Sequence, residues 1–61
     1  MTTIKEISTP KYVITLEETE EFKYVIRYKR STMKDYSYYQ FPDYGIADRV
    51  FDRTLMELEG H

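Results

Sequence analysis

The sequence predicts a small α+β fold, in which a three-stranded antiparallel β-meander carries one C-terminal α-helix on one face (βββα). Two segments in the first half of the chain alternate apolar and polar residues with a period of two, as strands do. A later segment is rich in aromatic residues that pleated sheets accept, and the last one repeats apolar residues at spacings of three and four. Short connections favour antiparallel neighbours, and burial of each apolar stripe places the helix on the sheet.

The N-terminal residues have no clear period. Thr9-Pro10 favours extended backbone just before the first periodic segment. We therefore expect residues 1–10 to be an N-terminal leader and residues 11–61 to form a single βββα domain. Ile4 and Ile7 are the residues that would pin the leader to this domain. A leader folded back over the edge of the sheet is the alternative to an open edge.

The first two strands are predicted on either side of an acidic hairpin loop. Residues 11–17 alternate as a strand, and the loop is expected at Glu17-Glu18-Thr19-Glu20-Glu21, because closely spaced like charges repel each other and favour a solvated turn. The second strand, residues 22–29, has the cleanest period. One of its faces is apolar and aromatic and the other is mainly cationic, with Phe22, Tyr24, Ile26 and Tyr28 alternating with Lys23, Val25, Arg27 and Lys29.

The third strand is predicted at residues 36–41, and its facing is ambiguous in the sequence. If Tyr39 and Phe41 face the core, Tyr36 and Tyr38 point outward, whereas a slip of one residue reverses all four. We favour the first arrangement because Phe41 has no polar tip and loses most by exposure to water.

The helix is predicted from Tyr44 to about Glu59. Pro42 ends the preceding strand, Asp43 is a suitable N-cap, and Gly60 is a natural stop. The apolar stripe of the helix is expected to consist of Ile46, Ala47, Val50, Phe51, Thr54, Leu55 and Leu58. The predicted core consists of Tyr12, Ile14, Leu16, Phe22, Tyr24, Ile26, Tyr28, Phe41, Val50, Phe51, Leu55 and Leu58.

Composition argues against several classes of function. The chain of 61 residues has no Cys and a single His, His61, so we expect no metal site and no cofactor. It is expected not to be an enzyme, because the serines have no evident base partner and so short a chain can hardly enclose a catalytic pocket. No apolar run reaches the roughly 18 residues of a membrane span, and no signal peptide is visible. We therefore expect a cytoplasmic protein without membrane contact.

The first candidate site is the sheet face opposite the helix. In the favoured register, the cationic side chains Lys23, Arg27 and Lys29 lie across from Tyr36 and Tyr38. Exposed rings beside cations suit a protein interface, and they equally suit stacking on nucleic-acid bases. The alternative is that these residues simply solvate the outer face of a sheet.

The second candidate site is acidic. Glu17, Glu18, Glu20 and Glu21, extended by Asp48 and Asp52 on the helix, form a set of carboxylates that could imitate a phosphate backbone, as a DNA mimic does. The alternative is a solvated hairpin tip that discourages aggregation. Separately, the open strand edges offer a route to a homodimer.

These observations favour a small acidic non-enzymatic protein-binding module. The element order resembles that of the small arm-binding domains at the front of phage tyrosine recombinases. The size and the net charge of −2 are similar to those of phage-encoded inhibitors of host nucleic-acid enzymes and defence nucleases, the anti-CRISPR proteins among them. That likeness implies a viral protein that sterically occludes such an enzyme. The alternatives are a nucleic-acid-binding module, which the net charge disfavours, and a homodimeric structural or assembly protein.

Overall fold

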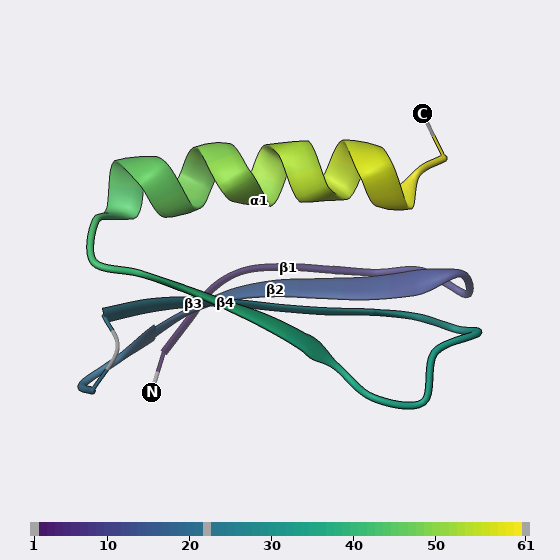
Figure 1. Ribbon diagram of the computed structural model, residues 1–61, viewed down its shortest axis with the longest axis horizontal. Coiled ribbons are helices and arrows are strands. Elements are labelled where there is room, and N and C mark those ends of the chain that lie inside the picture. The colour runs from purple at the N-terminus through teal and green to yellow at the C-terminus, as the bar shows by residue number, and fades with distance from the viewer. Residues whose placement is uncertain (1, 22, 61) are drawn as a thin grey trace.

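The chain folds into one antiparallel sheet with one helix on one of its faces (Figure 1). The computed structural model describes residues 2–21 and 23–60. The elements are β1 (Thr2–Ser8), β2 (Tyr12–Thr19), β3 (Lys23–Arg30), β4 (Ser37–Phe41) and α1 (Tyr44–Leu58). The predicted α+β outline, an antiparallel sheet followed by a C-terminal helix, is confirmed. The predicted number of strands is wrong, because the sheet has four strands in the order β1-β2-β3-β4.

The additional strand, β1, lies in the segment that was expected to be a leader. It pairs antiparallel with β2, with Ile7 opposite Ile14. A bulge between Thr3 and Lys5 shifts the register. Because a bulge resets the alternation of side chains, the segment has no constant period of two, and its sequence does not read as a strand. Thr9 closes the turn into β2 by a backbone N–H···O bond of 2.8 Å to the Tyr12 carbonyl.

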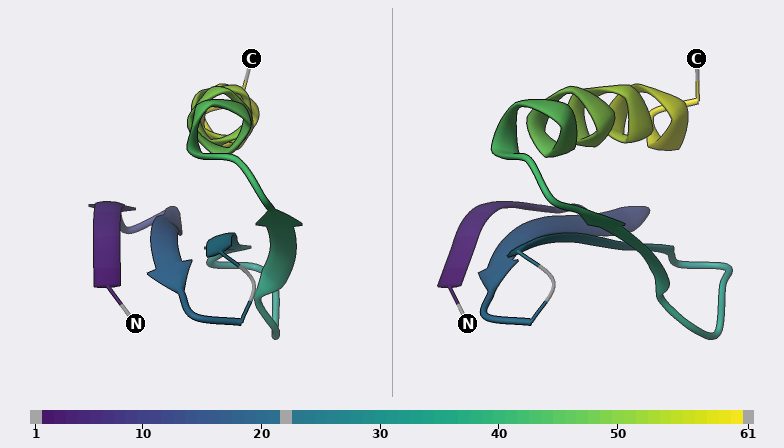
Figure 2. Two further views of the ribbon diagram at one scale, coloured as in Figure 1. Left: turned by 90° about the vertical axis from the view of Figure 1, so that its left-hand side faces the viewer. Right: turned by 60° about the vertical axis from the view of Figure 1, so that its left-hand side comes forward.

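The helix covers the middle of the sheet and leaves β1 and β4 at its two edges (Figure 2). Tyr39 lies opposite Ile26 on the face that the helix covers, and Tyr38 lies opposite Arg27 on the other face. The favoured register of the third predicted strand is therefore confirmed.

The core lies between this covered face and α1. It consists of three sheet residues and three helix residues, Ile14, Leu16, Ile26, Ala47, Phe51 and Leu58. Around it pack partly buried side chains, Ile7, Tyr12, Tyr24, Tyr28, Phe41, Val50 and Leu55. Phe22 of the predicted core is outside the described residues. Ile46 of the predicted stripe is exposed, because it precedes the buried Ala47 by one position and is rotated by about 100° from it.

Both helix ends have the expected caps. The Asp43 carboxylate accepts a hydrogen bond of 3.0 Å from the Ile46 backbone N–H, and Gly60 has the positive φ of 91° that favours glycine. The last turn of α1 contains no basic residue. Instead, Arg30 at the end of β3 donates a hydrogen bond to the Leu58 carbonyl, which places a cation at the negative end of the helix dipole.

Candidate functional site

The sheet face that α1 leaves free is the candidate site, and we call it the open face. The strand registers arrange its side chains in rows that cross the sheet. The middle row contains one residue from each strand, Glu6, Thr15, Arg27 and Tyr38. The row on one side of it contains Thr3, Glu17, Val25 and Gln40, and the row on the other side contains Ser8, Val13 and Lys29.

The centre of the open face is buried, although the described residues place no helix over it. Thr15 is only 7% exposed, and Glu17 and Val25 are buried to a similar extent. The β2–β3 turn and the loop between β3 and β4 both lie on this side of the sheet (Figure 1). The open face therefore has a small interior of its own and is not a uniformly solvated surface.

Arg27 is the central side chain of this face. Its Nε lies 3.0 Å from Oε1 of Glu17, and its guanidinium carbon lies 5.2 Å from the centroid of the Tyr36 ring. Among the described residues Nε has no hydrogen-bond partner, so its contact with Glu17 is an ion pair without a well-aligned N–H···O bond. The buried carboxylate balances the arginine charge and holds the guanidinium over the tyrosine ring.

The three tyrosines at and just before β4, Tyr36, Tyr38 and Tyr39, divide between the two faces of the sheet. Tyr36 and Tyr38 are exposed beside Arg27, and Tyr38 has 57% of its surface accessible. Tyr39 lies on the covered face, where its hydroxyl is 3.2 Å from that of Tyr28. This hydrogen bond is the main cause that raises the pKa of Tyr39 above its ordinary value. Only the first two rings lie next to the cationic side chains.

The acidic segment is not one loop. Glu17 and Glu18 lie within β2 and point to opposite faces, so the prediction of a loop beginning at Glu17 is wrong. Like-charge repulsion does not break the strand there, because Arg27 on the neighbouring strand compensates Glu17. Glu20 and Glu21 follow β2 and are exposed. The four predicted carboxylates are therefore not brought together on one surface.

The helix carboxylates proposed to extend this acidic set are also elsewhere. Asp48 forms an ion pair with Lys5 of β1. Asp52 is exposed on α1, which packs on the opposite face of the sheet.

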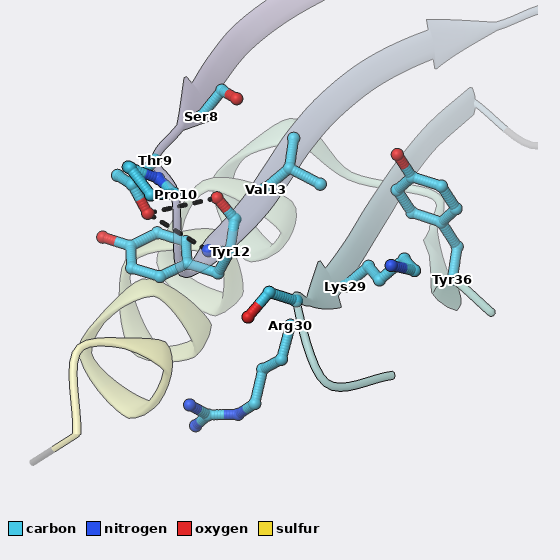
Figure 3. A pocket seen from close by; sticks show the side chains of 9 residues that line it. Ser8, Thr9, Pro10, Tyr12, Val13, Lys29, Arg30 and Tyr36 are labelled. Atoms are coloured by element: carbon cyan, nitrogen blue, oxygen red, sulfur yellow. Dashed lines mark hydrogen bonds between the residues drawn. The ribbon is translucent and has the colours of Figure 1, made fainter. Parts of the chain in front are cut away.

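A hollow lies at each end of the open face. The first has a volume of about 220 Å³ and is bordered by Lys29 and Tyr36 on one side and by Pro10 and Tyr12 on the other (Figure 3). The second, of about 300 Å³, is bordered by Lys23, Gln40 and Pro42. Each hollow adjoins one of the cationic residues of the open face, Lys29 at the first and Lys23 at the second.

Sequence reasoning grouped Lys23, Arg27, Lys29, Tyr36 and Tyr38, and the structure places all five side chains on the open face or beside it. It missed the pairing of Glu17 with Arg27. The sequence does contain a sign that Glu17 belongs to the strand, because Glu17 continues the alternation of Val13 and Thr15. The run of acidic residues that begins at Glu17 favoured a loop instead.

The described part of the chain contains no group of three His, Cys, Asp or Glu side chains placed to hold a metal ion. Within residues 2–21 and 23–60, no helix has the length and apolar character needed to cross a membrane. The open face presents the rings of Tyr36 and Tyr38, the guanidinium of Arg27 paired with Glu17, and the ammonium groups of Lys23 and Lys29. The chain matches no protein-family model, no curated protein sequence and no solved structure.

Proposed function

We propose that this protein is a small non-enzymatic protein-binding module whose open face contacts the partner, with Tyr36 and Tyr38 as anchors. The observation that carries the proposal is the pair of exposed rings beside an arginine that a buried carboxylate holds in place. Tyr and Arg are the residues on which binding energy concentrates in protein interfaces. A side chain that is already fixed loses less conformational entropy on binding, so Arg27 adds to the affinity at low cost.

The partner that we propose is a nucleic-acid-processing or defence enzyme, which the chain would occlude sterically as phage-type inhibitors do. The net charge of −2 and the exposed carboxylates of Glu20 and Glu21 support this choice, and Glu21 borders one of the two hollows of the open face. Such enzymes present basic surfaces to their substrates, and a negative module is attracted to them.

Direct binding of nucleic acid has less support on the same surface. Glu17 neutralises Arg27, and Glu6 lies in the same row, so Lys23 and Lys29 are the strand cations left to contact phosphates. Affinity for a polyanion depends on the number of phosphates that are neutralised, and two lysines neutralise few.

Affinity capture tests the proposed function. The tagged protein is incubated with lysate of the cells in which it acts, with and without nuclease, and retained proteins are identified by mass spectrometry. We expect the wild-type chain to retain a specific protein regardless of nuclease, and the Tyr36→Ala/Tyr38→Ala variant to lose it. Met56→Ala is the matched control, because Met56 is 58% exposed on α1, which packs on the other side of the sheet. Equal capture by the double variant, or capture that nuclease abolishes, would contradict the proposal.

A further inference from the structure

β4 is an edge strand with no feature that prevents pairing. Among the described residues no strand lies beyond it, and its register with β3 is regular. Its sequence, Ser-Tyr-Tyr-Gln-Phe, contains no charged residue and no proline. The outer backbone N–H and C=O groups of such a strand are a template for another strand.

The other edge of the sheet, β1, is protected in two ways. A bulge lies between Thr3 and Lys5, and bulges disrupt the regular ladder that a further strand would need. The Lys5 ammonium also reaches from this edge strand to Asp48 of α1, and a charge that points inward disfavours pairing at an edge. The two edges therefore differ, and only β4 is uncharged and regular.

We propose that β4 pairs antiparallel with β4 of a second copy of this chain, about a two-fold axis at Tyr39. A second copy is favoured as the partner because β4 has no charged residue, so two identical strands can pair without like-charge repulsion. In this register Tyr38 lies opposite Gln40 of the second copy on the open face. On the covered face the two Tyr39 side chains meet, and Tyr39 is 44% exposed in the single chain, which leaves it available for this contact.

The pairing joins two sheets into one continuous sheet and brings the two open faces together. Tyr38 of one copy becomes a diagonal neighbour of Tyr38 of the other, at about 7–8 Å, within reach of aromatic side chains. A pair of five-residue strands buries far less than the roughly 1,600 Å² of a standard interface, so the dimer forms at high protein concentration. The inference does not rest on the proposed function, because backbone groups and Tyr39 form this contact.

Sedimentation equilibrium tests the pairing over a series from about 1 µM to about 1 mM protein. We expect the wild-type mass to rise from 7.4 kDa towards twice that value. Tyr39→Lys and Tyr39→Glu should each stay monomeric, since like charges then meet at the axis. An equimolar mixture of the two should dimerise, because a lysine then faces a glutamate. Circular dichroism verifies that each variant is folded.

Cross-linking tests the edge independently. The chain has no cysteine, so a single introduced thiol reports one site. Tyr39→Cys should form a covalent dimer on mild oxidation much faster than Thr3→Cys on β1 or Met56→Cys on α1. Three results would overturn the inference: a wild-type mass of 7.4 kDa throughout, a mixture of charge variants that stays monomeric while the wild type dimerises, or faster cross-linking at Thr3 than at Tyr39.

Discussion

Thr15 places a buried hydroxyl on the open face. This hydroxyl has no hydrogen-bond partner among the described residues. An unsatisfied buried hydroxyl costs about 1–3 kcal/mol, and valine has nearly the same shape without that group. We therefore predict that Thr15→Val raises the free energy of unfolding by about 1 kcal/mol, measured by urea denaturation.

The matched control for this prediction is Thr3→Val, because Thr3 is exposed on the same face. Valine there should change the free energy of unfolding by no more than about 0.5 kcal/mol, as at most surface positions. Lower stability of Thr15→Val would contradict the prediction, since it would mean that the hydroxyl is bonded in the folded protein.

Single residues were predictable where their own chemistry decides their environment. Phe41 has no polar tip, and that alone selected the register that places Tyr38 on the open face and Tyr39 on the covered face. Glu17 could not be placed in the same way. Its burial depends on Arg27, ten residues further along the chain and across the sheet, and a local charge rule does not include that partner.

At the scale of elements, α1 could be predicted and β1 could not. The signals for α1 are local, since Asp43 and Gly60 mark its ends and the apolar spacing runs between them. The residues of β1 form a strand because they pair with β2 and because Ile7 packs against the core. Contacts of this kind are not visible in the sequence of a short segment, and the bulge also interrupts the period of two that would mark a strand.

The pair Lys5–Asp48 connects β1 to α1 and has a predictable pH dependence. The hydrogen bond from the Lys5 ammonium to Asp48 is the main cause that raises the pKa of Lys5 above its ordinary 10.5. Stability from a raised lysine pKa is complete below the unfolded pKa and is lost as the pH rises through the folded pKa. Both side chains are partly exposed, so the pair contributes about 0.2–1 kcal/mol.

We predict that Lys5→Met is less stable than the wild type at neutral pH, and that this difference disappears as the pH rises above 10.5. Urea denaturation at several pH values measures this difference in the free energy of unfolding. The same tyrosines ionise in both proteins, so their contribution cancels in the difference. Asp48→Asn should cost a similar amount or slightly less, because it removes the ion pair but keeps the Lys5 ammonium 5.4 Å from the centroid of the Phe51 ring, and the double variant should cost little more than Lys5→Met. A difference that grows at alkaline pH would exclude the ion pair as its source.

In the whole molecule, the net charge of −2 conceals an uneven distribution. The β2–β3 turn, which contains Glu20 and Glu21, lies at the same end of the molecule as the start of α1 but on the other side of the sheet (Figure 1). Lys11 and Arg30 lie near the end of α1. Arg30 is occupied at the helix C-terminus. Only part of the protein's positive charge is therefore available on the open face. Fewer cations there can contact the phosphates of a nucleic acid.

The salt dependence of any nucleic-acid binding should be shallow. The slope of log affinity against log salt is about −0.7 for each phosphate neutralised on a single strand. With Arg27 paired to Glu17, Lys23 and Lys29 remain on the strands of the open face, which predicts a slope of about −1.4 for a labelled oligonucleotide in fluorescence anisotropy. Glu17→Gln removes the compensating charge, and its slope should steepen to about −2.1 because Arg27 can then contact a third phosphate.

A wild-type slope of about −4 or steeper would mean that several more cations contact phosphates than the open face presents. It would favour the nucleic-acid hypothesis over the protein-binding one.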